Sequence, residues 1–396
     1  MQGRRLDRLP RGSHESRRVL RSLKSLAFLV LAVAAMTDGA RAQIITVDVD
    51  PWLADYLLEA VCSGEEIDEA RLRSSPLARA QVEHHTSFSR ARNMDALLDG
   101  LRAASRCEVP ENDVFRFRAV VEDKAAFEAT VDFLRSRASE IEAHVRESVL
   151  PYVPQDLRYS GNIALSIVGN PCGGFASGDY VFLALNCLRG NHEQEYSAIK
   201  VVSAHELFHA LQERFFWPDS TALEDVTTLD DAFALFFHWL MGEGTAEFVS
   251  DSRNIDGSGV LAETLSGFAD HGYGHIPLYT EFLGYAADML AAGDDYQHRL
   301  KNLYSLGFAG TGRQVFYYAG AAMAGHLERT WGRGTLICIF HLPPEQFVRA
   351  YHAAASQSSG QEALPLGDTV TAAANRLSNE RDAALRFEGC RNEGSP

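Results

Sequence analysis

The sequence lacks several features that would assign it to other protein classes. Lysine and arginine number 37 against 53 aspartates and glutamates, and so acidic a chain is a poor partner for nucleic acid or an anionic membrane. Beyond residue 42 no apolar stretch is long enough to cross a bilayer. No cysteine pair has the C-x-x-C spacing of a cysteine-ligated zinc site, although the chain has six cysteines: Cys62, Cys107, Cys172, Cys187, Cys338 and Cys390.

The first 42 residues have the pattern of a secretory signal peptide. They contain nine basic and three acidic residues, an apolar run at 26–35, and an A-x-A site at 40–42. The apolar run is short for a membrane span, although an uncleaved N-terminal anchor is an alternative. Residues 16–20 match a twin-arginine signal faintly, so the ordinary secretory route is favoured. Removing this segment changes the formal charge from −16 to −22 and predicts a periplasmic or secreted protein without an integral membrane span.

The even number of cysteines fits three disulfides in an exported chain. Six cysteines allow about 15 connectivities, and sequence alone does not choose among them. The order along the chain favours pairing of neighbours, which gives Cys62–Cys107, Cys172–Cys187 and Cys338–Cys390.

The clearest chemical pattern covers residues 201–211, which read V-V-S-A-H-E-L-F-H-A-L. His205 and His209 are four positions apart, so on a helix both imidazoles share one face and can bind one Zn²⁺. Glu206 falls beside the ion, where it can accept a proton from water as a general base. No other charged residue interrupts this stretch, as expected of a buried helix whose polar side chains serve a metal. A core helix with two hydrogen-bonded histidines is the alternative.

A catalytic zinc site needs a third protein ligand, and two glutamates further along the chain are candidates. Glu243 and Glu247 are four positions apart in a mostly apolar segment, so a helix places both carboxylates on one face. One can bind zinc while the other orients a histidine. His238 is another possibility, but on a helix it faces about 140° away from Glu243, which favours core packing.

These two segments resemble those of the gluzincin metallopeptidases, which include the membrane-alanyl-aminopeptidase-like families with their W-L-N-E-G-F-A-E-Y segment. Here residues 239–248 read W-L-M-G-E-G-T-A-E-F, with one extra residue before Glu243. The resemblance implies that Glu243 is the third ligand and Glu247 the supporting acid. No G-x-M-E-N exopeptidase segment precedes the motif, so aminopeptidase activity is not implied. The chain, over residues 160–336, also resembles bacterial families described only as zinc-dependent peptidases.

A tyrosine is the last candidate that the resemblance suggests. Residues 317–321, Y-Y-A-G-A, are similar to the Y-E-K-G-A segment of the aminopeptidase-like families, whose tyrosine stabilises the oxyanion. Alignment on the glycine selects Tyr317, although the matching lysine is absent. The chemistry needs a hydroxyl donor aimed at the developing oxyanion. An aromatic pair in a buried helix is the alternative.

Periodicity predicts the surrounding elements. Helices are expected over 53–61, 93–105 and 123–149, strands over 161–168 and 180–188, and a glycine turn at 173–178. The motif helix is expected to begin near Tyr196 and end at Pro218 and Asp219, and the helix with Glu243 to begin near Leu229. Residues 257–274 are expected to form a mobile loop over the site. The adjacent His84 and His85 are expected at the surface.

The predicted fold class is α+β, with a zincin-like core of a small mixed sheet and an active-site helix. The expected divisions are a signal peptide at 1–42, a largely helical region at 43–155, a gluzincin-like catalytic domain at 156–340 and a helical extension with a polar tail at 341–396. The expected activity is zinc-dependent hydrolysis of peptide or protein substrates. Two alternatives are a zinc-binding protein that recognises peptides without cutting them, and a structural protein with a chance motif.

Overall fold

The computed structural model describes residues 44–169, 172–217, 222–308, 314–357, 363, 365–379 and 385–393. The predicted signal peptide lies outside the described residues, as do Pro218 and Asp219. Contacts divide the chain into two units, one of residues 1–44 and 155–157 and one of residues 45–154 and 158–396. In the first unit the Ile44 amide donates a hydrogen bond to the Leu157 carbonyl at 3.1 Å. The site described below lies in the second unit.

The described residues contain one four-stranded sheet, in the order β1-β2-β4-β3. The strands are β1 (Ile44–Asp50), β2 (Arg158–Ser166), β3 (Gly173–Ser177) and β4 (Tyr180–Ala184). β2 pairs in parallel with β4 and β3 pairs antiparallel with β4, so the sheet is mixed. Together with the many helices this confirms the predicted α+β class. The glycine turn is predicted wrongly: Gly173 and Gly174 belong to β3, and the turn follows at Gly178, whose φ is +60°.

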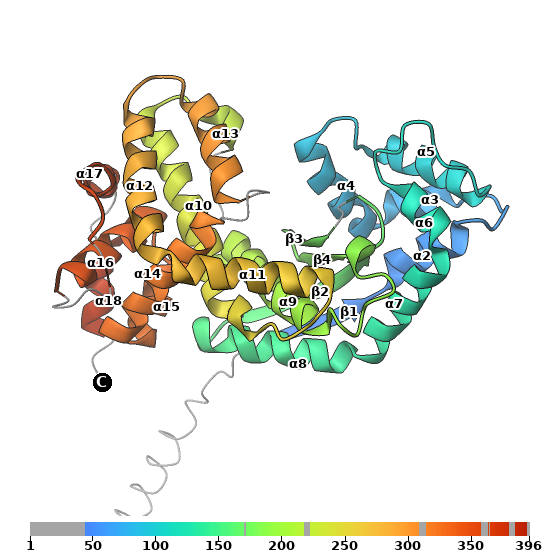
Figure 1. Ribbon diagram of the computed structural model, residues 1–396, viewed down its shortest axis with the longest axis horizontal. Coiled ribbons are helices and arrows are strands. Elements are labelled where there is room, and N and C mark those ends of the chain that lie inside the picture. The colour runs from blue at the N-terminus through green and yellow to red at the C-terminus, as the bar shows by residue number, and fades with distance from the viewer. Residues whose placement is uncertain are drawn as a thin grey trace, which may run out of the picture. The chain divides into compact units, whose positions relative to one another are not determined.

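The motif helix α9 (Tyr196–Leu211) begins where the sequence predicts. It packs against β3 and β4 and against two helices, α8 (Ala138–Val149) and α10 (Leu229–Ser250) (Figure 1). These neighbours cover it on several sides, which explains why apolar residues are distributed all around it. After Leu211 the chain continues as a π-helical turn, η3 (Gln212–Phe216). The motif is therefore held by packing on several sides.

The N-terminal region is helical, as predicted, and packs against the sheet through α2 and α4. The expected helix over 123–149 is two helices, because Arg137 departs from helical φ and ψ. The surface prediction is wrong for His85, which is 0% exposed and lies beside Phe115 and Phe175. The helices of this region are α2 (Trp52–Ala60), α3 (Glu69–Ser74), α4 (Pro76–Phe88), α5 (Met94–Ser105), α6 (Phe117–Glu122) and α7 (Lys124–Ser136).

The mobile loop predicted at residues 257–274 is wrong, because Val260–Gly274 forms helix α11. The buried Glu195 carboxylate accepts hydrogen bonds from the amides of Leu261 at 3.0 Å and Ala262 at 2.8 Å. A side chain more than 60 positions earlier thus caps the first turn of α11 and favours a helix over a loop.

Most of the remaining helices pack against α10, and its most extensive contact is with α14, whereas α15 and α18 pack on other helices of this group (Figure 1). The remaining helices are α12 (Ile276–Ala291), α13 (Tyr296–Gly307), α14 (Val315–Trp331), α15 (Arg333–Phe340), α16 (Pro344–Gln357), α17 (Asp368–Asn379) and α18 (Phe387–Glu393). Short 3₁₀ turns occur at Leu150–Tyr152, Leu185–Cys187, Leu223–Asp225 and Ser252–Asn254. In the part of the chain that the structure describes, no helix combines the length and apolarity needed to cross a membrane.

All six cysteines lie in described segments, and their pairing is the one that sequence order favours. The disulfides join Cys62 to Cys107, Cys172 to Cys187, and Cys338 to Cys390. Cys172 directly precedes β3, and Cys187 ends the 3₁₀ turn after β4. The second disulfide therefore anchors the start of the edge strand.

Candidate metal centre

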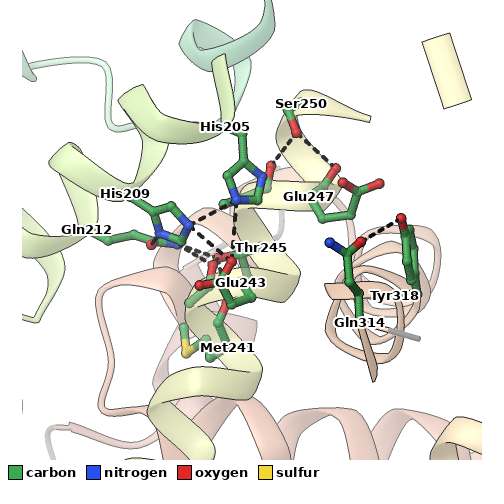
Figure 2. Close-up of polar contacts among 12 residues, drawn as sticks. His205, His209, Gln212, Met241, Glu243, Thr245, Glu247, Ser250, Gln314 and Tyr318 are labelled. Carbon is green, nitrogen blue, oxygen red and sulfur yellow. Dashed lines mark hydrogen bonds and ion pairs between the residues drawn. The ribbon is translucent and has the colours of Figure 1, made fainter. Parts of the chain in front are cut away.

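The structure brings His205 and His209 of α9 together with Glu243 of α10. The two Nε2 atoms lie 3.0 Å apart, and the Glu243 Oε2 lies 3.4 Å from that of His205 and 3.3 Å from that of His209. Figure 2 shows the three side chains pointing toward one another. Among the described residues, this is the group of His, Cys, Asp and Glu side chains whose ligand atoms are close enough to hold one metal ion.

These donors fit Zn²⁺. Tetrahedral bonds of 2.0–2.1 Å place neighbouring ligand atoms about 3.3 Å apart, close to the observed separations. Burial alone would raise the pKa of Glu243, but the two imidazoles hold it well below its usual range. Burial would likewise lower the pKa of His209, yet the Glu243 carboxylate raises it to about 9. The carboxylate thus creates a field that favours a positive charge among the three ligand atoms.

Glu206 lies beside this cluster and lines the same cavity, of about 610 Å³. Burial raises the pKa of its carboxyl group, and the charge of Glu243 adds to the effect. A raised pKa brings a carboxylate closer to the range in which it can accept and return a proton. Gly174 of β3 lies directly against it, since a Cβ at this position would be 2.5 Å from the Glu206 Cγ. Glycine at 174 is therefore what leaves room for Glu206 beside the edge strand.

Gln212 is a residue that sequence reasoning missed. Its Oε1 accepts a hydrogen bond from the His209 Nδ1 at 2.8 Å. Its Nε2 donates to the Gly242 carbonyl at 3.0 Å and to the Thr245 Oγ1 at 2.7 Å, which fixes the orientation of the amide. His209 must then carry its proton on Nδ1, which leaves the Nε2 lone pair free for a metal. A glutamine three positions after His209, within reach of its ring on a helix, is the sequence signal for this contact.

Tyr317, at the start of α14, lies next to the cluster as the resemblance implies. Its ring stacks on that of His205, with centroids 5.5 Å apart and an interplanar angle of 7°. Burial, followed by the charges of Glu243 and Glu206, raises its pKa, so the hydroxyl stays protonated at neutral pH. The neighbouring Tyr318 instead donates its hydroxyl to the Gln314 Oε1 at 3.2 Å. The two adjacent tyrosines thus have different surroundings, and Tyr317 is the one beside the candidate ligands.

Glu247 lies one turn after Glu243 and next to the cluster rather than in it (Figure 2). Its Oε1 accepts hydrogen bonds from the Ser252 amide and from the Tyr273 hydroxyl, each at 3.2 Å, and from the Ser252 hydroxyl. Burial raises its pKa, while the charge of His205 opposes this. The carboxylate is thus electrostatically coupled to His205, a candidate ligand, and also joins α10 to α11.

His238 does not belong to the ligand group. Its ring contacts that of Trp217 at 5.6 Å, and burial lowers its pKa to about 4. It borders the cavity as a neutral, half-buried side chain, so the core packing expected for it is only partial.

Comparison with known proteins agrees with this geometry. No curated protein and no solved structure gives a significant match to the chain. Residues 70–360, well over half of the chain, match the family described as "Putative zinc dependent peptidase (DUF5700)". The matched range contains α9, α10 and α14, and with them every proposed site residue. The chain belongs to the family so described.

Proposed function

We propose that this protein is an exported metallopeptidase of gluzincin type that hydrolyses peptide bonds. His205, His209 and Glu243 would hold Zn²⁺, which, when bound, polarises the scissile carbonyl and lowers the pKa of a water molecule. The observation that carries the proposal is the convergence of three candidate ligand atoms with a half-buried carboxylate, Glu206, beside them. The three disulfides support export.

The other residues then have separate roles in hydrolysis. Glu206 accepts a proton from the attacking water as its oxygen bonds to the carbonyl carbon, and passes that proton to the leaving nitrogen as the carbon–nitrogen bond breaks. Tyr317 donates a hydrogen bond to the developing oxyanion. Glu247 supports His205 electrostatically, and the free edge of β3 pairs with an extended substrate. The products are one carboxylate and one amine.

Glu206→Gln tests this mechanism. The variant keeps the size of the side chain and all three metal ligands, so zinc content should stay at about one ion per chain. Loss of general acid–base catalysis should slow peptide hydrolysis by about 10²–10⁴-fold. Glu263→Gln, which changes an exposed acid on α11, is the control and should cut like the wild type.

The measurement pairs elemental analysis for zinc with cleavage rates on a peptide that the wild type cuts. A Glu206→Gln variant that cuts at the wild-type rate would contradict the mechanism. Wild-type protein that holds zinc but cuts nothing in a broad peptide library would favour the binding-only alternative. Zinc retained at full stoichiometry after both His205→Ala and His209→Ala would contradict the ligand assignment.

A further inference from the structure

Two hollows meet at the metal centre. The large hollow, of about 610 Å³, extends from the ligands toward α4, α10 and α13. The small hollow, of about 270 Å³, extends in another direction, toward the start of α11 and the Ser250–Ser252 segment. Four residues line both hollows: Gly174, His205, Glu206 and Tyr317. The proposed catalytic groups therefore stand where the two hollows join, rather than at the closed end of one.

The edge strand β3 passes from one hollow to the other. Cys172 and Gly173 line the small hollow, Gly174 lines both, and Phe175 and Ala176 line the large hollow. β3 ends the sheet order and pairs with β4 on one side, so its other edge is available to another strand. An extended peptide paired along β3 would place residues in both hollows, with the bond between them beside Glu206.

The two hollows differ in chemistry. The small one has an apolar side formed by Val201, Val202, Leu261 and Leu265, and a polar side that includes Glu247. The large hollow combines aromatic side chains with charged and polar ones, and Phe88, at the end of α4, stands in it with 63% of its surface exposed. Besides Tyr317, its aromatic lining consists of Phe88, Phe175, Trp217, Trp239, Tyr304 and Phe308.

Each hollow also contains a charged group that could bind a chain terminus instead. Glu247 in the small hollow could bind a free ammonium group, and Arg92 in the large hollow could bind a free carboxylate. However, the Glu247 Oε1 already accepts hydrogen bonds from Ser252 and Tyr273. Arg92 shares its hollow with six aromatic side chains besides Tyr317. A substrate that continues through both hollows uses more of this surface than one that ends at the metal.

We propose that the enzyme cleaves internal peptide bonds of an extended chain, with a large aromatic or apolar side chain seated in the large hollow. This inference rests on the proposed peptidase function. It adds that neither substrate terminus is required, and that Phe88 contributes to recognition on one side of the bond.

Blocked peptides test the first part. A peptide of about ten residues, long enough to span both hollows at about 3.3 Å per residue, is compared in four forms: free, N-acetylated, C-amidated and doubly blocked. Mass spectrometry locates the cut and gives the rate with the zinc-loaded full chain. We expect all four forms to be cut at the same internal bond at rates within about threefold, because a terminal charge far from the bond contributes little in water.

Loss of cleavage on acetylation alone would overturn the inference in favour of terminal recognition by Glu247. Loss on amidation alone would overturn it in favour of Arg92. In both cases the proposed peptidase function would survive, because the free peptide is still cut. If no form is cut by zinc-loaded protein, the proposed function fails, and this inference with it.

Variants test the second part. Phe88→Ala should lower kcat/KM about tenfold for peptides with an aromatic residue next to the cut bond. The loss in kcat/KM should be smaller for peptides with alanine at that position, and the zinc content should not change. Tyr285→Ala, which removes another exposed aromatic on α12, is the matched control and should change neither rate. Leu265→Trp should narrow the small hollow and slow long peptides while the protein keeps its zinc. If Phe88→Ala lowers kcat/KM equally for peptides with an aromatic residue and peptides with alanine next to the cut bond, the large hollow does not bind a large substrate side chain.

Discussion

Gly244 of α10 and Gly320 of α14 are in direct backbone contact. A Cβ on Gly244 would lie 2.2 Å from the Gly320 Cα, and a Cβ on Gly320 would lie 2.3 Å from the Leu240 carbonyl oxygen. Glu243 directly precedes one glycine, and Tyr317 lies one turn before the other. The close approach of the two helices is therefore what brings Tyr317, the proposed oxyanion donor, next to Glu243, the proposed third ligand.

Gly320→Ala should separate these helices. Overpacking against a backbone costs about 1–3 kcal/mol, so we expect that loss in the free energy of unfolding, together with slower peptide cleavage as Tyr317 moves. Denaturant unfolding and a peptide assay measure the two effects. Gly325→Ala on the same helix is the control, because its Cβ would meet only side chains, the nearest at 3.2 Å. Equal stability of the two variants would contradict the prediction.

Gln212→Ala should weaken zinc binding without removing a ligand. The His209 ring would lose the acceptor that fixes its Nδ1 proton, and such losses typically lower metal affinity about 10–100-fold. Competition with a chromophoric chelator gives the dissociation constant. Gln81→Ala is a matched control, since Gln81 is equally buried and donates to Ser166 and Val168 away from the site. If both variants bind zinc as the wild type does, Gln212 does not position His209.

Loss of the Cys172–Cys187 disulfide should destabilise the edge strand. The two cysteines are 15 positions apart, and closure of such a loop stabilises a protein by about 3 kcal/mol. We expect the double serine variant to unfold at lower denaturant concentration and to cut peptides more slowly, because Cys172 precedes Gly173 and Gly174. Thiol titration of unfolded, unreduced wild-type protein should find no free thiol. Six reactive thiols would contradict the pairing.

Mild acid should destabilise the fold through His85. Burial lowers the pKa of this side chain from 6.5 to about 4, so as the pH falls below 6.5 the unfolded chain takes up a proton before the folded chain does. The contribution of His85 to stability is therefore complete above pH 6.5 and decreases progressively toward pH 4. Between pH 7 and pH 5 this amounts to about 1–2 kcal/mol in the free energy of unfolding.

Urea unfolding at the two pH values measures the effect. His85→Leu should reduce the loss on acidification, whereas His298→Leu, at an exposed position on α13, should leave it unchanged. If the His85 variant loses as much stability as the wild type, His85 is not the responsible group.

Local patterns in the sequence determined the two helices that carry the candidate metal site. The four-residue spacing of His205 and His209, and again of Glu243 and Glu247, predicted two helices, and both begin where expected. Helical periodicity needs only neighbouring residues, so it is visible without knowledge of the fold. The order of the cysteines led to the three pairs that the structure contains.

Tertiary structure alone decided the features that depend on distant partners. β1 was not predicted, because its neighbour in the sheet is distant in sequence. Thr46 of β1 donates a hydrogen bond to the carbonyl of Tyr159 in β2, 113 positions away. Helix α11 replaced a predicted loop because Glu195, which directly precedes α9, caps its first turn. Gly174 forms part of a strand instead of a turn because it pairs with Leu183 of β4. Such contacts join segments that are far apart in the sequence and form only when the chain folds. They leave no period in the sequence, so sequence patterns did not predict them.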